Sequence, residues 1–145
     1  LLTRMQAAGD ALTATFRRVP TDAWATPIKA NGYTPHDYLN YVMSLLELSG
    51  NAYLQSLRMD PVMMEAEIDA EARRNVERRK QRAIATDFDD YLASLRGLLI
   101  LIDMADDQQI AEVVQGRSRE IRFDVLVGIL QRLNGIISTW LDGRG

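Results

Sequence analysis

The apolar residues of this chain recur every three to four positions in four separate segments, and no segment of useful length alternates apolar and polar residues. The first pattern is typical of one face of an α-helix, whereas the second is typical of a half-buried strand. The chain is therefore expected to be all-α. The four predicted helices cover about residues 2–18, 35–58, 86–104 and 123–141.

Two of these helices begin at residues that favour helix N-termini. Thr34 precedes Pro35, and Asp37 follows three positions after Thr34, so a threonine N-cap, a proline at the first position and an acidic third residue coincide. Thr86 stands before a run of aspartates and is the expected N-cap of the third long helix.

The second and third long helices are separated by a charged stretch, residues 62–85, which has helix-forming residues and only a thin apolar stripe. It predicts either a surface helix or a partly ordered connection. A connection of this length favours a crossover, so we expect a four-helix bundle with a long crossover between its second and third helices. A further loop is expected at about 105–119, and residues 108–114 could form a short helix within it.

The composition excludes several kinds of chemistry. The chain has 145 residues, no cysteine and one histidine, so it has no thiolate nucleophile, no disulfide and no site that needs two imidazoles from one chain. A formal net charge of −3 gives no basic excess and argues against binding to nucleic acid. The longest aliphatic run, residues 98–102, is too short to span a membrane. With no signal-peptide pattern at the start, we expect a cytoplasmic protein with one domain over residues 1–145.

Short motifs in the chain resemble those of the DinB/YfiT-like superfamily. Trp24 and Pro27, followed by residues 32–35 (Gly-Tyr-Thr-Pro) at a helix start, resemble the entry into the second helix of that superfamily. Residues 86–96 look like its third helix, and the closing helix that ends at residues 140–141 (Trp-Leu) is similar to its fourth. The resemblance covers nearly the whole chain. It implies a four-helix bundle of up-down-down-up order that commonly forms homodimers.

The resemblance also implies a place for a metal. Many members bind a divalent metal through one histidine on the second helix and an H-x-x-x-H pair on the fourth, and relatives include thiol-dependent transferases and a mycothiol-dependent maleylpyruvate isomerase. In this sequence these positions fall on Tyr41 and near Leu133 and Ile137. Aliphatic side chains cannot ligate a metal, and a lone phenol is a poor substitute for imidazole. We therefore expect a degenerate site that is filled by packing and takes neither a metal nor a cofactor.

The same region could hold a small ligand, because ligand sites in helix bundles form between facing helices. The candidates to line such a pocket are Tyr41, Glu47, Gln131 and Asn134. The alternative is that Tyr41 is a core aromatic with a paired hydroxyl group and that the other three face solvent or an interface.

Two functions therefore stay open. The first is a small-molecule-binding or protein-interaction module, and a small-molecule site would need a cavity of roughly a few hundred cubic ångströms. The second is a thiol-dependent transferase or isomerase-like enzyme with a divergent active site. Such an enzyme would need at least two ionisable groups that converge near Tyr41.

Two further features are expected to be structural. His36, the single histidine, is expected to be a solvated residue of the first helical turn. The basic residues at 73–82 are nearly balanced by acidic ones at 65–71, which is typical of a solvated helix with i,i+4 pairs such as Asp69–Arg73. We therefore expect no nucleic-acid partner for this stretch.

Overall fold

The computed structural model describes residues 1–30, 32–57, 63–105 and 123–144. All regular secondary structure over these ranges is helical, which confirms the all-α prediction. The elements are α1 (Leu2–Arg17), the 3₁₀-helix η1 (Thr21–Ala23), α2 (Pro35–Leu57), α3 (Glu65–Arg78), α4 (Ile84–Met104) and α6 (Phe123–Arg144). The short helix expected at 108–114 lies outside the described residues.

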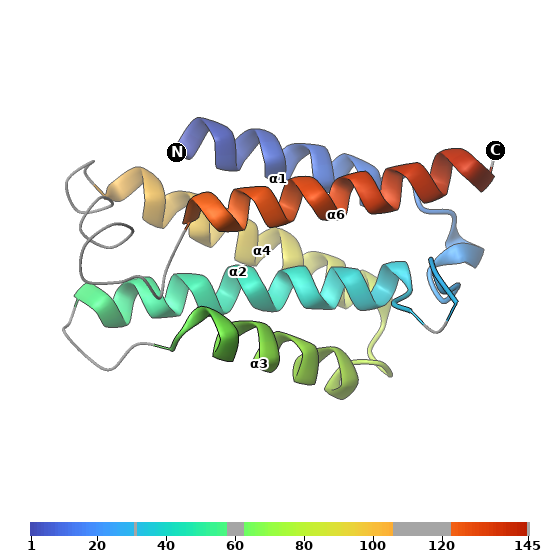
Figure 1. Ribbon diagram of the computed structural model, residues 1–145, viewed down its shortest axis with the longest axis horizontal. Helices are drawn as coiled ribbons and strands as arrows, with labels where there is room; N and C mark the ends of the chain where they lie inside the picture. Colours follow the sequence, from blue (N-terminus) through green and yellow to red (C-terminus); the bar gives the residue numbers. More distant parts are fainter. Residues whose placement is uncertain (31, 58–62, 106–122, 145) are drawn as a thin grey trace.

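Four long helices lie alongside one another, and α3 covers one side of this group (Figure 1). α1 and α6 run in one direction, whereas α2 and α4 run in the other. α3 follows α2 in the sequence and returns the chain to the end of the molecule where α2 began, so α4 runs parallel to α2. α2 packs mainly against α3 and α4, and α1 packs mainly against α6.

α2 begins at the position that the sequence predicts. The Asp37 N–H donates to the Thr34 hydroxyl oxygen at 3.1 Å, and the Thr34 N–H donates to Oδ2 of Asp37 at 3.1 Å. The two residues form a reciprocal capping box around Pro35, the first residue of the helix. This box fixes the first turn of α2, which leads to Tyr41.

The predicted start of the third long helix is wrong by three residues, because the N-cap of α4 is Ala83, which makes no side-chain cap, and the helix begins at Ile84. Thr86 therefore lies within the first turn. Asp87 and Tyr91 are fully buried, and Ile84 is partly buried at the preceding helical spacing. The inward face of α4 therefore begins at Ile84, two residues before Thr86.

The expectation of a solvated His36 is also wrong. Its side chain is 13% exposed, and its Nε2 lies 2.7 Å from Oδ2 of Asp87, whose side chain is 0% exposed. Nε of Arg82 lies 3.4 Å from the other carboxylate oxygen. This pair joins the first turn of α2 to the first turn of α4, and sequence reasoning missed it because its two members are 51 positions apart.

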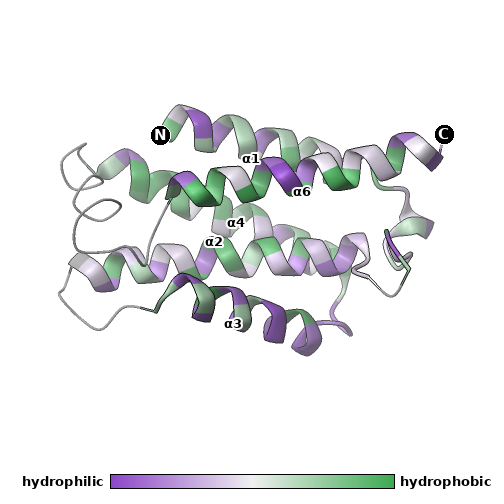
Figure 2. Ribbon diagram, viewed as in Figure 1, coloured by the Kyte–Doolittle hydropathy of each residue, from purple (hydrophilic) through white to green (hydrophobic). Residues whose placement is uncertain are grey.

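The predicted apolar stripes form one core. Figure 2 shows apolar residues along α1, α2, α4 and α6, whereas α3 is mostly hydrophilic. The charged stretch therefore contains a surface helix, and the residues of its thin apolar stripe, Ile68, Ala72 and Val76, are buried. No described helix combines the length and the apolar character needed to cross a bilayer. The apolar face of α6 is buried at Leu126, Val127, Leu130, Leu133 and Ile137.

Candidate functional site

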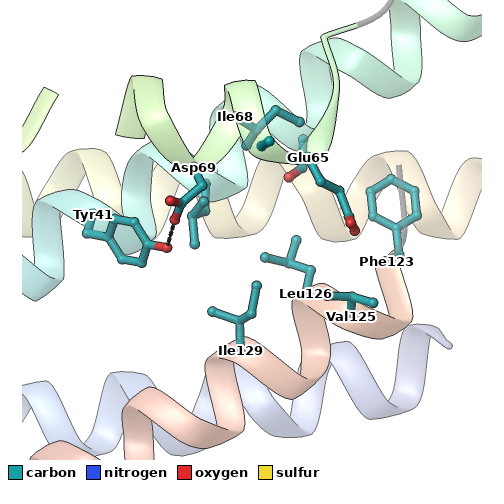
Figure 3. Close-up of a pocket in the computed structure, with 11 residues that line it drawn as sticks. Tyr41, Glu65, Ile68, Asp69, Phe123, Val125, Leu126 and Ile129 are labelled. Carbon is teal, nitrogen blue, oxygen red and sulfur yellow. Dashed lines mark hydrogen bonds between the residues drawn. The ribbon is translucent and has the colours of Figure 1, made fainter. Parts of the chain in front are cut away.

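A pocket of about 280 Å³ lies between α2, α3 and α6, and we call it the Tyr41 pocket (Figure 3). Its volume is close to the lower end of the range of about 300–1,000 Å³ that is usual for small-molecule sites. The size therefore suits a ligand smaller than a typical drug. The lining residues are Tyr41, Leu45 and Ser49 from α2, Glu65, Ala66, Ile68 and Asp69 from α3, and Phe123, Val125, Leu126 and Ile129 from α6.

The walls of this pocket are mainly apolar because they continue the core. Leu45, Phe123 and Leu126 are buried, and each belongs to the inward face of its helix. α3 packs against α2 through Ile68 and the rest of its apolar stripe rather than against α6. The space that remains between α3 and α6 is the pocket.

The polar end of the pocket is a chain of three side chains. The Tyr41 hydroxyl group donates a hydrogen bond to Oδ1 of Asp69, drawn as a dashed line in Figure 3. Nε of Arg73 donates to Oδ2 of the same carboxylate at 2.9 Å, so the predicted Asp69–Arg73 pair is confirmed. The Arg73 guanidinium also lies over the Tyr41 ring, 5.3 Å from its centre, in cation–π contact.

The hydrogen bonds among these three side chains, together with burial, hold Tyr41 in its protonated form and Asp69 in its ionised form at neutral pH. Burial raises the pKa of the Tyr41 phenol well above its usual value of 10.0, and the hydrogen bond to Asp69 raises it further. Burial also acts to raise the pKa of Asp69, but the hydrogen bonds from Tyr41 and Arg73 outweigh it and bring that pKa below its usual 3.8. A general acid or base needs a pKa near the working pH. Neither group is therefore suited to proton transfer at neutral pH, and both are suited to positioning a ligand.

Glu65 supplies the second carboxylate of the pocket, from the first turn of α3. Figure 3 shows its side chain reaching from α3 toward Phe123 and Val125 of α6. Within the described part of the chain, this carboxylate has neither a hydrogen bond nor an ion pair. It is therefore free to interact with a ligand.

The structure brings only Tyr41 of the four predicted pocket residues into this site. Glu47 is exposed and lines a different groove, between α2 and α4. Gln131 is exposed on α6. Asn134 is partly buried, and its Oδ1 accepts a hydrogen bond from the Thr15 hydroxyl group of α1.

Helix geometry explains why these residues separate. Tyr41 and Leu45 are four residues apart and share one side of α2, whereas Glu47 is two residues beyond Leu45 and is rotated by about 200°. On α6, Gln131 is two residues beyond the pocket residue Ile129 and is rotated by the same angle. The predicted set therefore does not share one face.

Sequence reasoning also missed Glu65 and Asp69, because the charged stretch was assigned to solvent. A signal for them was present. The apolar stripe of α3 begins at Ile68 and packs against α2. Glu65 and Asp69 lie three residues before and one residue after Ile68, so both border the packed face.

The positions that the resemblance assigns to metal ligands have two different environments. Tyr41 lines the pocket, whereas Leu133 and Ile137 are buried core residues with exposed fractions of 5% and 0%. No three His, Cys, Asp or Glu side chains in the described ranges lie close enough together to hold a metal ion.

Comparison of the chain with protein-family models, with curated proteins and with solved structures finds no match in any of the three. The candidate site is therefore identified from its geometry and its chemistry.

Proposed function

We propose that this chain is a small-molecule-binding module that holds a compact, mainly apolar ligand in the Tyr41 pocket. The observation that carries the proposal is the pocket of about 280 Å³, with apolar walls and a fixed polar group at one end. Small-molecule sites combine the same features, because the apolar walls supply affinity and a few placed polar groups set the orientation.

The proposal includes a bundle of the DinB/YfiT-like type whose metal site is lost. The directions of the long helices support the up-down-down-up order, and α3 supplies the crossover between α2 and α4. The burial of Leu133 and Ile137 supports the loss of the metal site, since core aliphatic residues occupy the positions of two ligands. The homodimer and the cytoplasmic location expected from the sequence complete this proposal.

A transferase or isomerase with a divergent active site is the second candidate. The observation that favours it is the presence of three ionisable groups, Tyr41, Glu65 and Asp69, around one pocket. The pKa directions of Tyr41 and Asp69 weigh against proton transfer by these two groups. Binding is therefore the better supported function.

A neutral apolar dye tests the binding function. N-phenyl-1-naphthylamine fluoresces more strongly in apolar surroundings, so we expect saturable binding with one dye per chain. Ile129→Trp fills the pocket and should weaken binding by about tenfold or more. Ile136→Trp is the matched control, because Ile136 lies on the same helix and lines a separate groove beside Trp140.

The two variants distinguish the pocket from other apolar surface. Equal binding by the parent chain and Ile129→Trp would contradict the proposal. So would a loss of binding that is confined to Ile136→Trp. Circular dichroism of both variants shows whether their helices are intact.

A further inference from the structure

The charged side chains among the described lining residues of the Tyr41 pocket are all acidic. Two carboxylates, those of Glu65 and Asp69, line it, and no lysine or arginine is among its described lining residues. A ligand that fills this pocket therefore meets negative charge and no positive side chain among these described lining residues. The two carboxylates differ in whether a basic side chain of the protein already pairs with them.

Asp69 is balanced within the protein. One of its oxygens accepts the hydrogen bond from Tyr41, and the other accepts one from Nε of Arg73 at 2.9 Å. The arginine is not a lining residue, so the pair presents Asp69 to the pocket as a neutralised group. Its role is to hold the Tyr41 ring in place.

Glu65 is not balanced. Among the other acidic residues of α3, Asp69, Glu71 and Glu77 each have a basic partner, whereas Glu67 has none in the described part of the chain. Glu65 has none among the described residues, and the pocket side chains near its carboxylate in Figure 3 are the apolar Phe123 and Val125. A cation placed there would gain a charge-assisted hydrogen bond to this exposed carboxylate, while its apolar part would contact the apolar walls.

The position of Glu65 in the helix explains only part of this arrangement. A negative charge in the first turn of α3 stabilises the helix through its dipole, and Glu67 occupies the same turn. Glu67 is exposed and lines no part of the pocket. The two glutamates thus share the helical role, and only Glu65 combines it with a place at the pocket.

We infer that the ligand of the Tyr41 pocket is a small amphiphilic amine, whose ammonium group binds the Glu65 carboxylate and whose apolar body packs along Leu126 and Ile129 toward Tyr41. This inference rests on the proposed binding function and adds the charge of the ligand to it. Glu65 is thereby assigned as the residue that determines specificity for a cation.

Three probes with the same eight-carbon chain test this inference: octylamine, 1-octanol and octanoate. At pH 7 the first is a cation, the second is neutral and the third is an anion. Titrations followed by isothermal calorimetry should give a Kd for octylamine about tenfold lower than that for octanol, with octanoate weakest. A rise in ionic strength from about 0.05 M to about 0.5 M should weaken the binding of octylamine and leave that of octanol nearly unchanged.

Glu65→Gln removes the charge and keeps the shape of an exposed side chain, so it should fold as the parent does. It is expected to weaken octylamine binding by about tenfold and to leave octanol binding unchanged. Glu67→Gln is the matched control, since it removes a charge from the same helical turn outside the pocket. It should change neither affinity.

The outcomes separate the inference from the function on which it rests. If octanol binds and octylamine binds no more tightly, the inference is wrong and the binding function stands. The same holds if the preference for the amine survives Glu65→Gln or falls equally in Glu67→Gln. If none of the three probes binds the parent chain, the binding function itself is refuted, and the inference with it.

Discussion

The hydrogen bond between His36 and Asp87 offers a direct test of how the first turns of α2 and α4 are held together. Asp87 is fully buried, and its Oδ2 lies 2.7 Å from Nε2 of His36. Its other oxygen lies 3.4 Å from Nε of Arg82, a side chain that is 40% exposed. His36→Ala would therefore leave a buried carboxylate with one distant, half-solvated partner.

The expected loss of stability follows from this geometry. Removing the hydrogen-bond partner of a buried group costs about 1–3 kcal/mol, and more when that group is charged, because the remaining group stays buried without compensation. Since Arg82 remains and water can enter the vacated space, we expect His36→Ala to lower the free energy of unfolding by about 3 kcal/mol. Arg82→Ala removes an exposed partner and should cost about 0.5 kcal/mol. Asp87→Asn keeps the shape and one hydrogen bond and should cost about 1 kcal/mol.

Urea unfolding followed by far-ultraviolet circular dichroism measures these free energies, because the described secondary structure is helical. The double variant His36→Phe with Asp87→Leu adds a check. It removes both polar partners, so its loss of stability should be smaller than the sum of the losses in the single variants His36→Phe and Asp87→Leu. A loss below about 1 kcal/mol for His36→Ala would refute this reasoning. So would an equal loss for Arg82→Ala, because the exposed pair would then matter as much as the buried one.

The Asp69 carboxylate has a lowered pKa in the fold, so its interactions stabilise the protein above about pH 4 and are lost as the pH falls below that value. Asp69→Asn should therefore reduce the acid sensitivity of the urea midpoint, and an unchanged acid profile would contradict this. Burial raises the pKa of the Tyr91 phenol to about 12, so on a rise in pH the unfolded chain loses the phenolic proton before the folded chain does. The free energy of unfolding should therefore decline above about pH 10. An absorbance titration of the phenolate that shows ionisation of Tyr91 before unfolding would disprove this. Elemental analysis after incubation with Zn²⁺ and Ni²⁺ is expected to find no stoichiometric metal, whereas one ion per chain would show that a site exists. Sedimentation over a range of concentrations should show a dimer that dissociates on dilution, and a monomer at every concentration would rule out the expected homodimer.

The helices were predictable because their causes lie close together in the sequence. The capping box joins Thr34 and Asp37, three residues apart, and the pair of Asp69 and Arg73 spans one helical turn. The error at the start of α4 has a non-local cause, since the burial of Asp87 depends on His36, which lies on another helix.

The candidate site was only partly predictable. Tyr41 was found because the resemblance placed a functional position there. The other proposed residues failed because their rotation about the helix axis places them away from the pocket, as for Glu47 and Gln131. The carboxylates of Glu65 and Asp69 were assigned to solvent because a charged stretch alone does not show which of its side chains borders a packed face.

By itself, the sequence determined the helical class and the apolar face of each long helix, and it allowed the charged stretch to be either a surface helix or a partly ordered connection. These depend on hydrogen bonds and spacings within a few residues. Only the tertiary structure decided which polar groups meet. The partners Tyr41 and Asp69 are 28 residues apart, His36 and Asp87 are 51 apart, and Thr15 and Asn134 are 119 apart. Such contacts depend on how helices rotate and pack against one another, and that packing is settled by the whole core rather than by any one segment.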